Sequence, residues 1–595
     1  GLVGFEKIIK RDSGTWTMPA GHGLTVTFFQ VEAGTLIANG TYTSSLCSVY
    51  NNATLKGTGT FNGTGAVNID STATLAPGNS IGQMTVNRDL WFGPNATLEI
   101  EVNVGASDSI VVDGVVTLNG TLSVVDLSGG TIAGGTQYNI ISATGGFTGS
   151  FDQIVDDSAV LDFVVDQNGP FLRLTGYLER TYRDVADTGN RRAIGGVLDE
   201  ARGAAQLATL TGELDALDDA ELNQAMQSLA PGAAASMIFT TQRNTEQFAI
   251  NLGRQARASR NGSLAMTSTD HTGFGLPGRT LLAMTGQDPQ LLAYAMQQTD
   301  AEADAPAGEA SPQADPAQSR WNLFVMPFGQ VGQVDSSSQR VGYDHWSTGL
   351  TAGLDYRLNG QWVVGVCGAY QYSRADFDDG LGEGTLHSGR IGPYVNWTRG
   401  PWQLDASVTG GYHWYDNDRH VMVGGFDRTA TSEHEGFDIS AFAQLAHDCQ
   451  LGAWTLTPSI AVQYIHLEED GYTETGAGPA NLVVDDSDHD ALRSVVGARL
   501  WRTVEANGLQ LVPELWAGWA FEWLDNEPEL TSRFVSGPAT SFTTISDTAG
   551  RHSALIGAGV TALINARTSI YGKHETEWTD VARTHSFWVG VEHRF

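Results

Sequence analysis

Residues 402–414 read WQLDASVTGGYHW, and their strict alternation of polarity decides the fold. The apolar positions are Trp402, Leu404, Ala406, Val408, Gly410, Tyr412 and Trp414. The polar positions are Gln403, Asp405, Ser407, Thr409 and His413. A period of two indicates a strand whose faces meet different environments. The aromatic residues at the ends of the apolar face are typical of the headgroup level of a membrane.

The same pattern recurs in residues 361–372, 454–464 and 509–523. Strands of a soluble sandwich usually run about five or six residues. These segments run about ten to fifteen, which spans the hydrocarbon when the strand is tilted. The apolar face therefore meets lipid, and the polar face lines a lumen.

Twelve such strands are predicted between residue 321 and the C-terminus. They start near residues 321, 346, 361, 385, 401, 434, 451, 490, 508, 552, 567 and 583. Short turns at Asn359-Gly360, Arg399-Gly400, Gln450-Leu451 and Asn507 alternate with long loops at 415–433, 467–489 and 524–551. That alternation is typical of outer-membrane barrels. An even strand count places both ends of the barrel on the periplasmic side.

The N-terminal part repeats a short phrase with a period near 20. The phrases are Gly34-Thr35-Leu36, Ala53-Thr54-Leu55, Ala73-Thr74-Leu75, Ala96-Thr97-Leu98 and Val116-Thr117-Leu118. Short β-type phrases at this period, separated by Gly and Asn turns, predict the rungs of a β-solenoid. A β-sandwich with strands of similar spacing is the alternative.

The part between solenoid and barrel changes to Ala, Leu and Glu at helical spacing. Helices are predicted over 190–210, 220–229 and 233–257. Residues 300–319 contain five acids and no base before Arg320, and they are predicted to be a disordered linker.

Composition excludes several classes of function. The chain has 595 residues, with 33 Lys and Arg against 67 Asp and Glu, giving a net charge of −34. This balance argues against nucleic acid and anionic leaflets as partners. Three Cys far apart make neither a disulfide framework nor a metal site. The sequence begins without Met or a signal peptide, so we expect a mature form or an excised fragment.

The order of these features resembles a classical monomeric autotransporter (type V secretion). The resemblance is carried by the solenoid with residues 73–82, ATLAPGNSIG, and by Tyr138-Asn139-Ile140-Ile141 followed by Gly145-Gly146-Phe147. It continues in Leu229-Ala230-Pro231-Gly232 of the helical connector, the twelve-strand barrel and the terminal Phe.

The resemblance implies an all-β fold with a helical connector. Residues 1–177 would be a right-handed parallel β-solenoid passenger with an autochaperone-like end, and 178–320 the connector with a lumen-plugging helix. Residues 321–595 would be a 12-stranded antiparallel outer-membrane β-barrel translocator. Helix 234–258 is the expected plug, with 285–299 as a shorter candidate.

The last strand resembles the family's barrel-assembly signal. Phe587, Val589, Val591 and Phe595 share its apolar face, whereas His593 departs from the usual pattern. The expected partners are therefore outer-membrane lipid and the barrel-assembly machinery.

The expected function is self-secretion and surface anchoring of the passenger in a Gram-negative bacterium, for adhesion or self-association. A host-cell or neighbouring-cell surface ligand is a further expected partner. We expect a monomer that binds no nucleic acid, cofactor or metal and is not an enzyme. One alternative is an enzyme passenger, a protease or esterase, whose catalytic domain precedes residue 1. A plain porin is the second.

Three motifs contain residue types that could carry chemistry. Gly78-Asn79-Ser80-Ile81-Gly82 fits the G-x-S-x-G nucleophile elbow, which requires a strand-to-helix turn and a His, so a solenoid turn is favoured. Asp488-His489-Asp490 is predicted to lie in a solvated loop. Tyr571, Lys573, Glu575 and Glu577 alternate on one strand face, which predicts lumenal salt bridges to the plug helix.

Passenger release by some autotransporters implies an Asn of the lumenal helix that attacks its own main-chain carbonyl. Asn244 and Asn251 lie on the expected plug, so they are the candidate cleavage residues. Because that chemistry usually occurs at an Asn-Asn junction, we predict that passenger and barrel stay one covalent chain.

Overall fold

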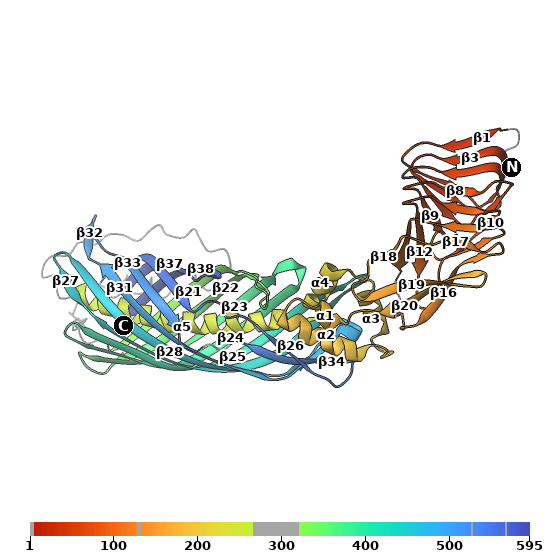
Figure 1. The fold of residues 1–595 in the computed structure, drawn as a ribbon. Coiled ribbons are helices and arrows are strands. Elements are labelled where there is room, and N and C mark those ends of the chain that lie inside the picture. The colour runs from red at the N-terminus through yellow and green to blue at the C-terminus, as the bar shows by residue number, and fades with distance from the viewer. Residues whose placement is uncertain (1–4, 128–131, 266–319, 525–526, 566–567, 595) are drawn as a thin grey trace, which may run out of the picture.

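Solenoid, helical connector and barrel follow one another along the chain (Figure 1). The computed structural model describes residues 5–127, 132–265, 320–524, 527–565 and 568–594. The predicted order of an N-terminal β-solenoid, helices and a 12-stranded antiparallel barrel is confirmed.

The solenoid is built from short parallel strands. Their bounds are β1 (Lys7–Lys10), β2 (Thr15–Met18), β3 (Gly23–Val31), β4 (Thr35–Ala38), β5 (Thr41–Val49), β6 (Thr54–Gly57), β7 (Thr60–Asn62), β8 (Val67–Ile69), β9 (Thr74–Pro77), β10 (Gln83–Asn87), β11 (Leu90–Phe92), β12 (Thr97–Val102), β13 (Ser109–Val112), β14 (Val116–Leu118), β15 (Thr121–Asp126), β16 (Thr136–Ala143), β17 (Phe147–Gly149) and β18 (Gln153–Asp156). Leu36, Leu55, Leu75 and Leu98 stack in register and are buried. Each rung thus buries the same apolar position as its neighbours.

The fifth predicted phrase was wrong in its position. Val116-Thr117-Leu118 is β14, which pairs with β11 on another face of the solenoid. The column of leucines continues instead at Leu122, which pairs with Leu98. Residues 103–108 lengthen this rung. A fixed period of about 20 therefore predicts the next leucine of the column at Leu118, four residues before its actual position.

An antiparallel pair closes the solenoid towards the connector. Strands β19 (Leu161–Asn168) and β20 (Phe171–Leu178) pair with each other, and β20 pairs with β16. Asp156 is the last residue of β18, which contacts β19. Its side chain accepts a hydrogen bond from the Ser158 backbone N–H at 3.1 Å. Burial, together with nearby carboxylates including Asp162, raises the pKa of Asp156 from its usual 3.8 to about 6.

This pKa predicts that β18 is more stable at pH 5 than at pH 7. Because the folded state holds a proton on Asp156 between about pH 4 and pH 6 while the unfolded state does not, stability falls as pH rises through that window. Asp156→Asn should slow hydrogen exchange of the β18 amides at pH 7 and flatten the pH dependence of their protection. The exposed Asp166→Asn is the matched control. An unchanged pH dependence in the Asp156 variant would contradict the prediction.

Helices of the connector follow the solenoid. They are α1 (Tyr182–Val185), α2 (Gly189–Ala201), α3 (Ala208–Asp215), α4 (Asp219–Leu229) and α5 (Gly232–Ala265). Thr181 and Asp218 start α1 and α4 with capping boxes. The single helix predicted over 190–210 was wrong, because the chain breaks after α2 at Gly203, whose φ is +84°.

The barrel is one closed antiparallel sheet. Its strands are β21 (Trp321–Val334), β22 (Tyr343–Arg357), β23 (Trp362–Phe377), β24 (Gly382–Arg399), β25 (Trp402–Val423), β26 (Phe426–His447), β28 (Trp454–Glu469), β31 (Ser487–Trp501), β33 (Leu509–Glu522), β36 (His552–Leu563), β37 (Thr568–Trp578) and β38 (Ala582–Arg594). Pairing of β21 with β38 and of β26 with β28 closes the ring. The short strands β27 (Cys449–Leu451) and β32 (Val504–Ala506) extend two turns.

The alternation quoted from residues 402–414 is confirmed on β25. Trp402, Val408 and Tyr412 face outward and are exposed, whereas Asp405 and His413 face the lumen and are buried. The outward face is apolar and the lumen is polar, as in a barrel surrounded by lipid.

The three predicted long loops were wrong, and in 467–489 short strands occupy 472–473 and 482–484. Residues 415–433 continue β25 and β26 as a long hairpin, because Val421, Val423 and Phe426 stay apolar and pack into the connector core. Segment 524–551 holds β34 (Glu529–Phe534) and β35 (Phe542–Ile545). These pair with β29 (Tyr472–Thr473) and β30 (Leu482–Val484) in a small sheet at the connector end.

Some expectations lie outside the described residues, namely the linker 300–319, the helix candidate 285–299 and Phe595. Within the described ranges, no helix has the length and apolarity needed to cross a membrane.

Candidate functional site in the barrel lumen

Helix α5 runs along the inside of the barrel from the connector end (Figure 1). Between Ser236 and Asn251, almost all of the polar side chains of this helix are buried. Hydroxyls of Ser236, Thr241 and Thr245 donate to the carbonyl four residues earlier, at 3.2, 3.1 and 3.1 Å. The helix therefore satisfies part of its polarity internally, and the rest is satisfied by the barrel wall.

A cluster of charges holds the middle of α5 to one wall. Arg243 bonds Glu246 of its own helix and Glu577 of β37, each at 2.8 Å. Arg493 of β31 bonds the same Glu246 and reaches Glu577 at 2.7 Å. Glu522 of β33 lies 3.6 Å from Arg493. Two guanidinium groups thus bridge three carboxylates in a buried place, where an uncompensated charge is costly.

A second charged group lies at another part of the wall. Asp438 of β26 accepts hydrogen bonds from Arg390 of β24 and contacts His413 of β25 at 2.6 Å. Thr245 Oγ1 of α5 accepts from Arg390 at 2.5 Å and lies 3.1 Å from Asp438 Oδ2. Each of the two charged clusters therefore contains at least one residue of α5 that is hydrogen-bonded to the barrel wall.

Neutral contacts fix the two asparagines. Asn244 Nδ2 donates to Ser373 Oγ at 3.1 Å, and its Oδ1 accepts from Gln371 at 2.5 Å. Asn251 Nδ2 donates to Thr351 Oγ1 at 3.1 Å, and its Oδ1 accepts from Trp588 Nε1 at 2.6 Å. Three barrel strands, β22, β23 and β38, thus bind the two side-chain amides.

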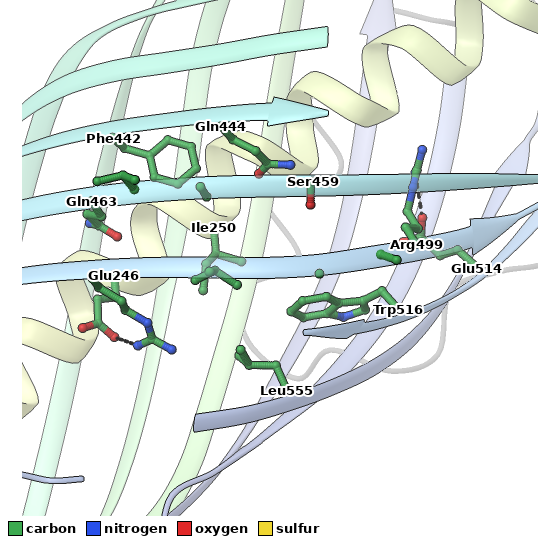
Figure 2. Close-up of a pocket in the computed structure, with 16 residues that line it drawn as sticks. Glu246, Ile250, Phe442, Gln444, Ser459, Gln463, Arg499, Glu514, Trp516 and Leu555 are labelled. Atoms are coloured by element: carbon green, nitrogen blue, oxygen red, sulfur yellow. Dashed lines mark hydrogen bonds and ion pairs between the residues drawn. The ribbon is translucent and has the colours of Figure 1, made fainter. Parts of the chain in front are cut away.

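A small cavity remains beside the helix (Figure 2). It measures about 100 Å³ and lies between α5 and strands β26, β28, β31, β33 and β36. Ile250, Phe442 and Trp516 supply apolar walls, and the Arg499–Glu514 ion pair lies beside it at 3.0 Å. Space of this size admits a few waters.

Residues 323–575 match the family model of the autotransporter beta-domain. The barrel belongs to the autotransporter beta-domain family. It is the translocator domain and lies in the outer membrane, and α5 is the plug of that barrel.

Curated relatives cover this autotransporter in part. Esterase EstA of Pseudomonas aeruginosa is 28% identical over 257 residues, which is 42% of this chain and 39% of that protein. An extracellular serine protease of Serratia marcescens is 24% identical over 550 residues, 90% of this chain and 51% of that protein. The chain thus spans about half or less of the length of these two relatives.

Solved structures with similarity include two autotransporter domains. The translocator domain of NalP from Neisseria meningitidis is 14% identical with a TM-score of 0.39, covering 51% of this chain and 97% of that one. The transport unit of AIDA-I from Escherichia coli is 15% identical with a TM-score of 0.36 and the same coverages.

Several predicted residues of the autotransporter lie where expected. Glu577 faces the lumen and pairs with the plug, as predicted for its strand face, and Cys367 is a small buried residue against Phe248 of α5. Phe587, Val589 and Val591 of the predicted assembly signal share the exposed outer face of β38.

The loop placement of Asp488-His489-Asp490 was wrong. These residues start β31, and His489 turns inward, where its Nε2 lies 3.3 Å from Gln242 Oε1 and its ring meets Phe239 edge-on. Alternation continues through the triplet, so His489 contacts the plug while its two acidic neighbours point the other way.

Ser80 lies in an exposed segment between β9 and β10 of the solenoid. In the described part of the passenger, no hydrogen bond joins Ser80 to a histidine. The segment is held by Asp108, whose Oδ1 accepts from the Gly82 backbone N–H at 2.8 Å. The G-x-S-x-G motif is therefore a solenoid turn.

The sequence reading missed Arg390, Asp438 and Arg493. All three occupy inward positions of alternating strands, where a charge in a lumen requires a partner. That signal was present in the sequence, but period two gives the face of a side chain and not its partner.

Proposed function

We propose that this autotransporter carries its own solenoid through the outer membrane and keeps it anchored at the cell surface for adhesion or self-association. The observation that supports anchoring is a continuous apolar core. It runs from Val160 of the solenoid through Tyr182, Leu214 and Leu229 of the connector to Val421 of the barrel hairpin. A passenger seated in this way is displayed as a fixed body.

Hydrogen bonds also join the solenoid, the connector and the barrel. The Ser158 hydroxyl donates to the Asp215 carbonyl at 2.6 Å, which joins solenoid to connector. Asn190 of α2 donates to the Ile545 carbonyl at 2.7 Å and accepts from its N–H at 2.9 Å, which joins connector to barrel.

Covalent retention is the second half of the proposal. Cyclisation of an asparagine requires its amide nitrogen to approach its own carbonyl carbon. Asn244 and Asn251 are both helical, and each amide nitrogen donates to a hydroxyl of the wall. Neither of these hydrogen bonds is to a carboxylate that would serve as a base.

We predict one uncut chain in the outer membrane. Mass spectrometry of the membrane-bound protein should find peptides that span residues 244–245 and 251–252. Asn244→Ala and Asn251→Ala should leave the mass pattern unchanged. A new N-terminus after either residue, abolished by the corresponding substitution, would show that the plug is cut.

Assembly is proposed to use the last strand. Phe587, Val589 and Val591 offer an apolar edge to the barrel-assembly machinery, with Phe595 as the terminal residue of the signal. The proposed unit is a monomer, because the closed ring leaves no strand edge for a second copy. Neutral or weakly polar surface ligands suit the acidic chain better than nucleic acid.

An enzyme passenger is the second candidate. Similarity to an esterase and to an extracellular serine protease favours it, because this chain spans only part of each. A catalytic domain would then precede residue 1. Assays of intact cells with p-nitrophenyl butyrate and with casein decide between the two: hydrolysis by cells that display the native precursor supports the enzyme passenger, and its absence supports the adhesin.

A further inference from the structure

An open hollow of about 590 Å³ lies on one face of the solenoid, where β5, β8, β11 and β14 run side by side. Ser48, Asn68, Trp91 and Thr117 form one column along it, each in register with the next. The residues that flank each of these four in its strand are buried, so the column lies on the outer face. Asn68, Trp91 and Thr117 are half-buried there, and Ser48 is covered by its surroundings. The volume is in the range of small-ligand sites.

Two aromatic rings line this hollow. Tyr50 and Trp91 are both half-buried. The Tyr50 hydroxyl accepts a hydrogen bond from Gln30 Nε2 at 3.0 Å, which fixes that ring. The Trp91 ring lies over Gly93, where an added Cβ would stand 3.0 Å from Cη2. Glycine thus leaves room for the indole, and both rings are held in place with part of their surface open.

Two carboxylates lie among the same lining residues. Asp89 Oδ1 accepts from the Val115 backbone N–H at 2.7 Å, which leaves its second oxygen for a ligand. The Asp70 side chain makes no hydrogen bond to the described parts of the chain. Neither Lys nor Arg is among the residues that line the hollow. Such a surface repels anions and accepts hydrogen bonds from hydroxyl groups.

The hollow cannot bind a peptide by strand addition. Strand β8 is already hydrogen-bonded to β5 on one side and to β11 on the other. Strand addition needs an open sheet edge. Recognition here must come from side chains: aromatic faces, carboxylates, the Asn68 amide and hydroxyls.

We propose that this hollow binds a neutral oligosaccharide. Sugar rings combine apolar C–H faces, which pack on Trp91 and Tyr50, with hydroxyls, which donate to Asp70 and Asp89. Four rungs at about 4.8 Å span about 14 Å, which suits a short segment of glycan. The proposal deepens the proposed adhesion and depends on surface display for its biological use.

The full chain in a detergent without a sugar headgroup, lauryldimethylamine oxide, provides the test. Isothermal titration is done with maltotriose, cellotriose and chitotriose as neutral probes and with 3′-sialyllactose as the anionic one. We expect at least one neutral probe to bind with a Kd of 1 mM or tighter. Trp91→Ala should weaken it at least tenfold, Trp91→Phe should retain most of it, and Asp70→Asn should weaken it severalfold.

Trp16→Ala is the matched control, since Trp16 is an exposed tryptophan on strand β2 of the other sheet. Circular dichroism confirms that each variant folds. No binding of any neutral probe, preferential binding of 3′-sialyllactose, or binding unaffected by Trp91→Ala would overturn the proposal. The titration uses purified protein, so it succeeds or fails independently of display, which labelling of intact cells measures.

Discussion

Replacing Arg493 with methionine is expected to unseat the plug helix and open a conducting path through the barrel. The substitution leaves the buried Glu246 and the half-buried Glu577 and Glu522 with only Arg243 to balance them. Breaking a buried ion pair by removing one partner costs about 3–5 kcal/mol. A shift of that size raises the fraction of open barrels by about two to four orders of magnitude. Planar-bilayer recordings should show sustained currents where the parent is nearly silent.

Arg399→Met is the matched control, because Arg399 is exposed at a turn of the barrel. The control should conduct like the parent. A heat-dependent shift on a denaturing gel shows for each variant that the barrel itself has folded. Parent-like silence from a folded Arg493→Met barrel would show that the charge cluster does not hold α5.

Arg419→Met is expected to release the connector from the barrel. The Arg419 guanidinium forms a fork with Glu474 at 2.9 and 2.5 Å and donates to the carbonyls of Ser228 and Ala480 at 2.7 and 2.9 Å. Ser228 lies in the last turn of α4, where a cation is also favoured by the helix dipole. Methionine leaves the buried Glu474 without its counter-charge, which destabilises the folded state by about 3–5 kcal/mol. Hydrogen exchange in α1–α4 should accelerate by a hundredfold or more.

Two further variants separate the causes of that effect. Arg419→Lys keeps the charge but loses the fork, so it should give an intermediate rate. The double variant Arg419→Met/Glu474→Met removes both charges and should be protected better than Arg419→Met alone. Equal exchange in the double and single variants would mean that the stranded carboxylate is not the cause.

The strand alternation was enough to predict the barrel. A shift of one residue in the assigned faces would place Asp405 and His413 in lipid, so only one assignment is possible. The loop predictions failed where the alternation continues beyond the expected strand ends, because the connector or α5 covers those strand extensions. Val421 and Val423 are apolar because the connector covers them, and His489 turns inward because α5 lies there. The helix was predicted from its spacing of apolar and charged residues, and its place in the lumen was implied by the resemblance to autotransporters. That the strand face of Glu577 would meet the plug was predicted, but its pairing with Arg243, 334 residues away along the chain, was not.

Labelling of intact cells tests the central claim, that this barrel carries its own solenoid outward. In a Cys449→Ser background, Cys47 and Cys367 are buried, so a membrane-impermeant maleimide reports only on an introduced thiol. Ala106→Cys places that thiol on an exposed solenoid turn, and Gln361→Cys places it at the barrel end opposite the connector. The account predicts labelling of Ala106→Cys on intact cells and of Gln361→Cys only after the outer membrane is permeabilised. Labelling of Gln361→Cys but not of Ala106→Cys on intact cells would contradict it.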